Sequence, residues 1–162
     1  MIRRVLSALA LSALVTTAGC SSSDSTTGPG GGGGPQGNFG MSATINGQAW
    51  AAAAKPSVAV SNGIFAMAGL NLTYGISMAV VQATGPGTYS LTYLNTPGSS
   101  GIVASGTGGG WDTYAPGGSG SVTFTTFTSN HVVGTFSMVA AAVSGGATGT
   151  LTVTNGAFDV TY

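Results

Sequence analysis

The chain contains few side chains that could carry out acid, base or nucleophilic chemistry. Apart from many hydroxyl groups, the candidates outside the first 20 residues are Asp24, Lys55, Asp112, His131 and Asp159. Serine, histidine and aspartate are all present, but no Gly-x-Ser-x-Gly turn stands between a strand and a helix. No paired carboxylates are available for general acid–base catalysis. We therefore expect a noncatalytic protein, with a His131-dependent hydrolase as the enzymatic alternative.

The same inventory argues against a metal or phosphate site. Zinc requires three or four ligands, and the predicted folded part offers only Asp112, His131 and Asp159. Calcium would need an Asp-rich loop, which is missing. Gly108-Gly109-Gly110 lacks the Lys-Ser/Thr pair and the helix that follow a phosphate-binding loop. We expect no metal and no cofactor.

Trp111-Asp112-Thr113-Tyr114 is the candidate ligand-binding motif, within a Gly-rich connection. Trp111 and Tyr114 could stack on a sugar ring while Asp112 accepts hydrogen bonds from its hydroxyls. In the alternative interpretation, which we favour, Trp111 folds back as a lid over one end of the core. His131 follows Ser129-Asn130 at a predicted hairpin turn, where a lone histidine is expected to be exposed.

Cys20 is the only cysteine, and its surroundings predict lipidation. Residues 1–19 combine Arg3 and Arg4, an apolar run over 5–15 and small residues before Cys20, as in a signal peptide. The run is too short for a membrane-spanning helix. Thr17-Ala18-Gly19-Cys20 resembles the lipobox of bacterial lipoproteins, although the first position is usually leucine. A lone exported thiol has no disulfide partner, so we expect acylation of Cys20 and a membrane anchor.

The charge of the mature chain excludes several partners. Lys55 stands against three aspartates and there is no glutamate, which excludes the basic surface that nucleic-acid binding requires.

Ser21 follows Cys20; in enterobacterial sorting, aspartate at that place retains a lipoprotein in the inner membrane. We therefore expect a cell-envelope protein in the outer membrane, on its periplasmic face or at the cell surface.

The composition changes between a tether and a folded domain. Residues 20–38 are rich in Gly, Ser and Pro and predict a flexible linker, whereas residues 39–162 predict one all-β domain. Asn46-Gly47, Asn62-Gly63 and Asn155-Gly156 separate β-prone runs, and Asn-Gly favours type I′ hairpin turns. The expected strands cover residues 41–45, 48–53, 57–61, 64–70, 73–82, 88–94, 120–128, 131–142, 148–154 and 157–162.

Alternation in these strands predicts one apolar and one polar face. Val132, Phe136 and Met138 share one side of their strand, while Val133, Thr135 and Ser137 share the other. About eight to ten short antiparallel strands then indicate a β-sandwich or a small closed barrel. Residues 95–120 form a long Gly-rich break with only a weak strand at 101–105, which is typical of a functional or disordered connection.

Four motifs in this order resemble a known family. They are Met41-Ser-Ala-Thr-Ile-Asn-Gly-Gln-Ala-Trp50, Gly87-Thr-Tyr-Ser-Leu91, Gly134-Thr-Phe-Ser137 and Thr154-Asn-Gly-Ala-Phe158. Together they are similar to the bacterial lipoprotein family called domain of unknown function 6252. The resemblance covers roughly residues 40–162 and implies a β-rich fold after a lipobox and a linker. It implies no activity and no catalytic residues.

Three functions are open at this point. The leading hypothesis is a membrane-tethered, noncatalytic β module for binding or envelope structure, with a glycan or an envelope protein as its partner. The rivals are the hydrolase and a membrane-spanning β-barrel. The barrel needs strands of about 9–11 residues with outward apolar bands, and most expected strands are shorter.

Overall fold

The computed structural model describes residues 39–92 and 98–162, and all regular structure in them is β-strand. The predicted signal peptide (1–19), Cys20 and the predicted linker (20–38) lie outside the described residues. No helix capable of crossing a membrane occurs in the described ranges. The strands are β1 (Phe39–Ile45), β2 (Gln48–Ala51), β3 (Ser57–Ser61), β4 (Ile64–Leu70), β5 (Tyr74–Val81), β6 (Gly87–Ser90), β7 (Ser100–Ser105), β8 (Gly110–Asp112), β9 (Ser119–Phe127), β10 (His131–Ser144) and β11 (Thr150–Thr161).

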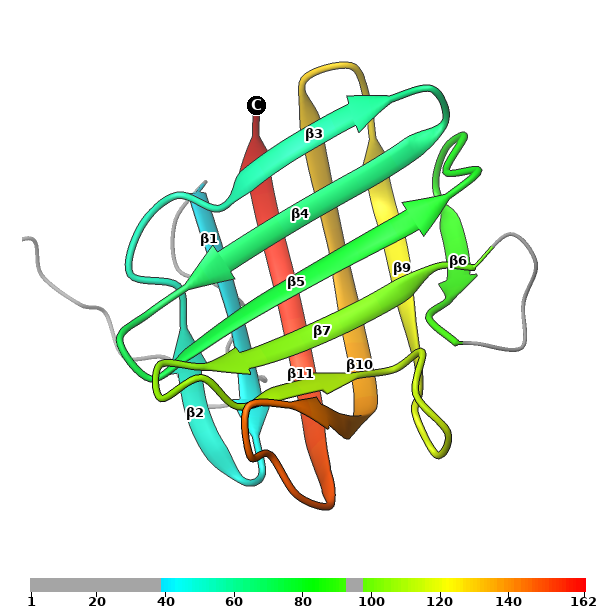
Figure 1. The fold of residues 1–162 in the computed structure, drawn as a ribbon. Coiled ribbons are helices and arrows are strands. Elements are labelled where there is room, and N and C mark those ends of the chain that lie inside the picture. The colour runs from blue at the N-terminus through cyan, green and yellow to red at the C-terminus, as the bar shows by residue number, and fades with distance from the viewer. Residues whose placement is uncertain (1–38, 93–97) are drawn as a thin grey trace, which may run out of the picture. The chain divides into compact units, whose positions relative to one another are not determined.

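These strands form a single antiparallel sheet that curls into a half-barrel. Its main path runs β2-β1-β11-β10-β8-β7-β5-β4-β3, and β9 pairs with β10 and β6. The long strand β10 joins two walls because Val132–Val139 pair with β9 and Ala141–Ser144 pair with β8. In Figure 1 the wall of β3, β4, β5 and β7 crosses obliquely over the wall of β1, β11, β10 and β9. The predicted antiparallel all-β fold is thereby confirmed.

Two of the three Asn-Gly pairs form the predicted hairpin turns. Asn46 and Gly47 have φ of 46° and 82° and connect β1 to β2, while Asn62 and Gly63 have φ of 51° and 74° and connect β3 to β4. Two consecutive residues with positive φ define the type I′ turn, whose twist matches that of the flanking strands.

The third Asn-Gly pair does not form a turn, so the prediction of two strands at 148–154 and 157–162 is wrong. Asn155 (φ 51°) is an extra residue inside the continuous strand β11, and the register shifts there against both β1 and β10. This is a β-bulge. A Cβ on Gly156 would lie 2.6 Å from the ring of Phe136 and would also overlap the Phe136 carbonyl oxygen, so the close approach of β10 requires glycine.

Residues 98–120 carry more structure than the sequence indicated. The weak strand predicted at 101–105 is the well-paired strand β7, which lies between β5 and β8. Strand β8 follows β7 after a short turn, whereas β5 ends at Val81, well before β7 begins at Ser100. The local signal was weak because the pairing with β5 is a contact between separate parts of the chain.

The hydrophobic core lies between the two walls and is rich in aromatic side chains. Phe65 on β4 meets Phe124 on β9 edge to face, with ring centroids 4.8 Å apart, and Phe124 also meets Phe158 on β11 at 5.7 Å. Trp50 packs into this core, as predicted, and its Nε1 donates to the Tyr74 carbonyl at 3.0 Å. These contacts tie the two walls together and leave each wall with an outer face.

Candidate functional site

Trp111 and Asp112 lie on strand β8 and not in a loop, which corrects the sequence-based placement. Register pairs Trp111 with the buried Val103 and Asp112 with the exposed Ile102. Because successive residues on a strand point to opposite faces, Trp111 and Asp112 point to opposite sides of the sheet. Trp111 packs against the core, and its Nε1 donates to the Thr148 carbonyl at 3.3 Å.

The remaining members of the predicted motif are held by local bonds. The Asp112 Oδ1 accepts the backbone N–H of Tyr114 at 2.8 Å, which fixes the turn after β8. Thr113 is buried, and its Oγ1 accepts the N–H of Gly101 at 2.9 Å. Tyr114 is 41% exposed. The structure therefore does not gather Trp111, Asp112 and Tyr114 around one ligand position.

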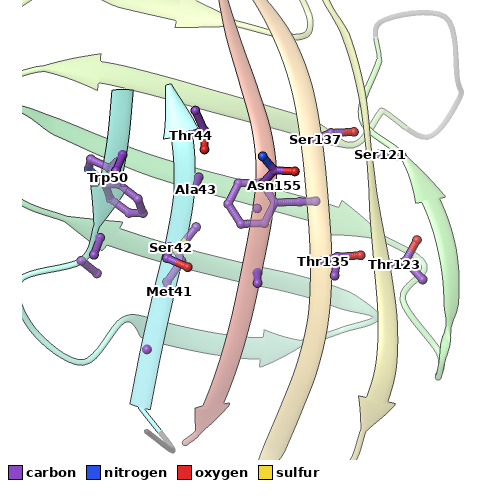
Figure 2. A pocket seen from close by; sticks show the side chains of 17 residues that line it. Met41, Ser42, Ala43, Thr44, Trp50, Ser121, Thr123, Thr135, Ser137 and Asn155 are labelled. Atoms are coloured by element: carbon purple, nitrogen blue, oxygen red, sulfur yellow. The ribbon is translucent and has the colours of Figure 1, made fainter. Parts of the chain in front are cut away.

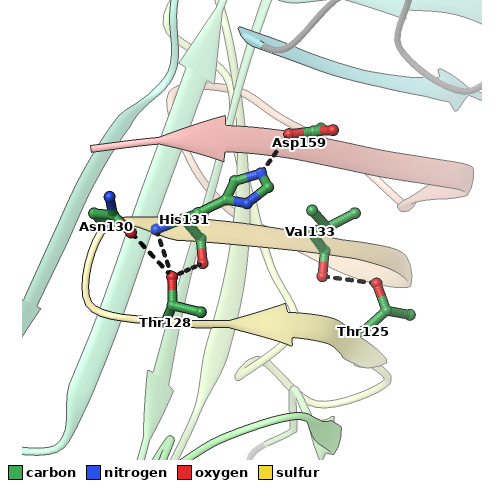
Figure 3. A network of polar contacts seen from close by, with 6 residues as sticks. All are labelled: Thr125, Thr128, Asn130, His131, Val133 and Asp159. Atoms are coloured by element: carbon green, nitrogen blue, oxygen red, sulfur yellow. Dashed lines mark hydrogen bonds and ion pairs between the residues drawn. The ribbon is translucent and has the colours of Figure 1, made fainter.

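His131 is the first residue of β10, and its ring is hydrogen-bonded to the carboxylate of Asp159 on β11. Its Nε2 lies 2.8 Å from the Asp159 Oδ1, and the two side chains are 36% and 33% exposed. The hydroxyl of Thr128 bonds instead to main-chain atoms of His131 and to the Asn130 amide, as Figure 3 shows. This hydroxyl stabilises the β9–β10 turn. His131 is thus paired and half-buried at a strand end.

No cluster of three or more His, Cys, Asp and Glu residues that could hold a metal ion is found within residues 39–92 and 98–162. The three candidate ligands from the sequence lie on different strands: Asp112 is on β8, His131 on β10 and Asp159 on β11.

The outer face of the wall of β1, β11, β10 and β9 carries an ordered set of hydroxyl groups. We call it the hydroxyl face and define it by Ser42 and Thr44 on β1, Ser121 and Thr123 on β9, and Thr135 and Ser137 on β10. Figure 2 looks onto this face, where an open hollow of about 1100 Å³ includes all six residues in its lining. Thr135 and Ser137 are exposed and the other four are half-buried.

The hydroxyls lie in rows because the strands are in register. One row joins Ser42, Ala157, Thr135, Thr123 and Thr88 across β1, β11, β10, β9 and β6. The last two form a hydrogen bond, with their Oγ1 atoms 2.8 Å apart. A second row joins Ser137, Ser121 and Ser90. Neighbouring strands in a sheet are about 4.7–4.9 Å apart, so β10, β9 and β6 present hydroxyls at this spacing, while Ala157 on β11 interrupts the first row.

The alternation of each strand produces this face. On β10 the inward residues Val132, Phe136 and Met138 are at most 4% exposed, which turns Thr135 and Ser137 to the other side. The sequence predicted a polar face for this strand. It contained no signal for the rows, because their alignment depends on which strands are neighbours.

A smaller hollow of about 290 Å³ lies on the outer face of the wall of β3, β4, β5 and β7. Small side chains dominate its lining, among them Ala59, Ala66, Ala68, Ala79 and Ser77. The two outer faces therefore differ: one is rich in hydroxyls and the other in small apolar groups.

The fold and this site define a charge-poor, antiparallel all-β domain with a neutral polar face. The chain belongs to the family described as domain of unknown function (DUF6252), whose model matches residues 38–160. The match includes the whole hydroxyl face, and it confirms the resemblance found in the sequence. No curated protein and no solved structure matched the chain.

Proposed function

We propose that this protein is a noncatalytic binding module of the bacterial cell envelope, tethered to a membrane by lipid on Cys20, and that it binds a neutral carbohydrate polymer on its hydroxyl face. The observation that supports the proposal is the alignment of serine and threonine hydroxyls in rows across neighbouring strands. The tether is supported by the lipobox-like sequence before Cys20.

The chemistry of the face fits a ligand made of repeated hydroxyl groups. Each serine or threonine hydroxyl can donate one hydrogen bond and accept others, which matches the hydroxyls of a sugar. Hydroxyl groups on the face repeat from one strand to the next. Along a single strand they repeat at every second residue, a distance of about 7 Å. Because water competes, one hydrogen bond contributes only about 0.5–1.5 kcal/mol. Useful affinity therefore requires several contacts with a repeating polymer.

The charges near the face favour a neutral ligand over an anionic one. Asp159 is paired with His131 on the same side of the wall as Thr135. Lys55 lies between β2 and β3 in the sequence, and the defined hydroxyl face contains no cationic residue. The defined hydroxyl face therefore offers an acidic polymer no lysine or arginine to offset its charge.

The proposal is tested with the full-length lipidated protein in vesicles and a panel of insoluble neutral polysaccharides, by co-sedimentation. We expect binding to one of them, and an affinity reduced about tenfold or more in Thr123→Val/Thr135→Val, since two hydrogen bonds are lost. Valine keeps the branched shape that suits a strand. The matched control is Ser77→Ala/Ser100→Ala on the other wall, which should bind as the parent does.

Three results would contradict the proposal. The first is failure of the parent protein to bind any polysaccharide in the panel. The second is unchanged binding in the double valine variant combined with lost binding in Tyr114→Ala, which would favour the aromatic motif. The third is turnover of a bound glycan that disappears in His131→Ala, which would establish the hydrolase alternative.

A further inference from the structure

Strand β3 is an unprotected edge of the sheet. It pairs with β4 on one side, and no described residue pairs with its other side. Figure 1 shows β3 at the border of its wall. Four of its five residues are exposed and Val58 is half-buried. An exposed strand edge presents free N–H and C=O groups that can pair with another strand unless charges, proline or bulges prevent it.

The hairpin geometry identifies which backbone groups face outward. Ser61 and Ile64 flank the two-residue turn and therefore form a hydrogen-bonded pair, after which bonded and non-bonded pairs alternate. Ser57, Ala59 and Ser61 then bond to β4. The N–H and C=O groups of Val58 and Val60 point away from β4 to the free edge.

The sequence of this edge is symmetric about its centre. Ser57-Val58-Ala59-Val60-Ser61 reads the same in both directions and contains no charge. When two such strands run antiparallel with Ala59 opposite Ala59, Val58 of each copy lies opposite Val60 of the other. Val58 and Val60, whose backbone N–H and C=O groups point outward, are then directly opposite each other and can form hydrogen bonds.

We propose that β3 pairs with β3 of a second copy of this chain, antiparallel and about a two-fold axis at Ala59. The two outward pairs, Val58 with Val60 and Val60 with Val58, each exchange two backbone hydrogen bonds. Ala59 lies opposite its counterpart as a non-bonded pair. A two-fold interface of this kind uses the same patch on both subunits and closes without further growth.

The two faces of the sheet remain consistent across the interface. Residues directly opposite each other in an antiparallel pair lie on the same face, so the valines align with valines and Ala59 with Ala59. The hollow lined by Ala59 and Ala66 then continues from one copy into the other. No bulky or charged side chain on β3 opposes the approach.

The neighbouring residues set the length of the pairing. Pro56 precedes β3 and lacks a backbone N–H, and Asn62-Gly63 turns the chain after it. The two Lys55 residues would lie at opposite ends of the paired strands, about 27 Å apart along them, so they would not repel strongly. Five paired residues bury much less than the 1,200–2,000 Å² of a standard interface, so we expect weak association that is observed at high concentration.

Disulfide trapping tests this register in the full-length protein at high concentration under mild oxidation. Ala59→Cys should form a covalent dimer readily, because Cα atoms of a non-bonded antiparallel pair are about 4.5 Å apart and a disulfide spans 4.4–6.8 Å. Ser57→Cys and Ser61→Cys are matched controls on the same strand and face. Copies of each should form about tenfold less dimer, because identical positions lie about 14 Å apart.

A mixture of differently sized Ser57→Cys and Ser61→Cys chains gives a second test, since these positions lie opposite each other in the proposed register. Mixed dimers should form, while neither variant links to itself. The parent chain, whose only cysteine is Cys20, measures any bridge through that residue. In a charge test, Ala59→Lys should abolish the dimer signal in chemical cross-linking while the circular dichroism of the domain stays unchanged.

Some outcomes would overturn the proposal. They are equal dimer formation by the three cysteine variants, self-linking of Ser57→Cys above that of Ala59→Cys, and dimerisation that survives Ala59→Lys. Each would indicate another register, another surface or a monomer. None of them depends on the carbohydrate-binding proposal.

Discussion

The wall that carries the hydroxyl face contains a β-bulge whose geometry depends on Gly156. Gly156 follows the bulged Asn155 on β11, where the backbone of β10 approaches closely. Any side chain at this position would meet Phe136, a core residue that is only 4% exposed. The bulge therefore needs glycine for space at Gly156 and a residue tolerant of positive φ at Asn155.

We expect Gly156→Ala to destabilise the protein by about 2–3 kcal/mol, since overpacking displaces buried groups. Chemical denaturation of the full-length protein measures this as a lower midpoint. Gly85→Ala is the control, because nothing lies within 4 Å of a Cβ placed there. Equal midpoints for the two variants would contradict the steric account of the bulge.

Aromatic contacts between strands hold the two walls together. Phe124 on β9 has aromatic contacts with Phe65, Tyr89, Phe127 and Phe158. It is 2% exposed and lies on the side of β9 opposite Ser121 and Thr123. The hydroxyl rows are therefore positioned by an aromatic cluster on the reverse side of the same strand.

We expect Phe124→Ala to cost about 3–5 kcal/mol of unfolding free energy, as for other large-to-small changes in cores. Val143→Ala, at a side chain 54% exposed, should change it by less than about 0.5 kcal/mol. Both are measured by denaturant unfolding. A small effect of Phe124→Ala would mean that the walls are held together elsewhere.

The whole molecule combines this domain with a predicted anchor. Stability has to come from the β core and the sheet, because the chain has one cysteine and therefore no internal disulfide. In the proposed function, tethering would also strengthen binding, since many copies on one membrane could engage one polymer together.

Replacement of the proposed lipidation site tests the anchor. We expect the parent chain to incorporate a clickable fatty acid during growth in a bacterial host and to sediment with membranes, and Cys20→Ala to lose the label completely. Ser22→Ala should remain labelled and serves as the matched control. Fatty-acid labelling that persists in Cys20→Ala would contradict lipidation at this residue.

By itself, the sequence determined most of the strands and two hairpin turns, because alternation, Asn-Gly pairs and strand-forming side chains act over a few neighbouring residues. It did not indicate strand β8. Four motifs along the domain also indicated the family. Predictions from local sequence were wrong where contacts between distant strands determine the backbone conformation. Asn155-Gly156 looked like a turn, yet pairing with β1 on one side and β10 on the other keeps β11 continuous.

Only the tertiary structure decided the site. Trp111 and Asp112 are adjacent in sequence, but they point to opposite faces because pairing with β7 and β10 makes this segment a strand. The serine and threonine residues of the hydroxyl face come from three strands spread over nearly the whole domain, and the order and register of those strands place them in rows. The physical reason is that side-chain alternation is a property of one strand, whereas the rows depend on which distant strands the core brings together.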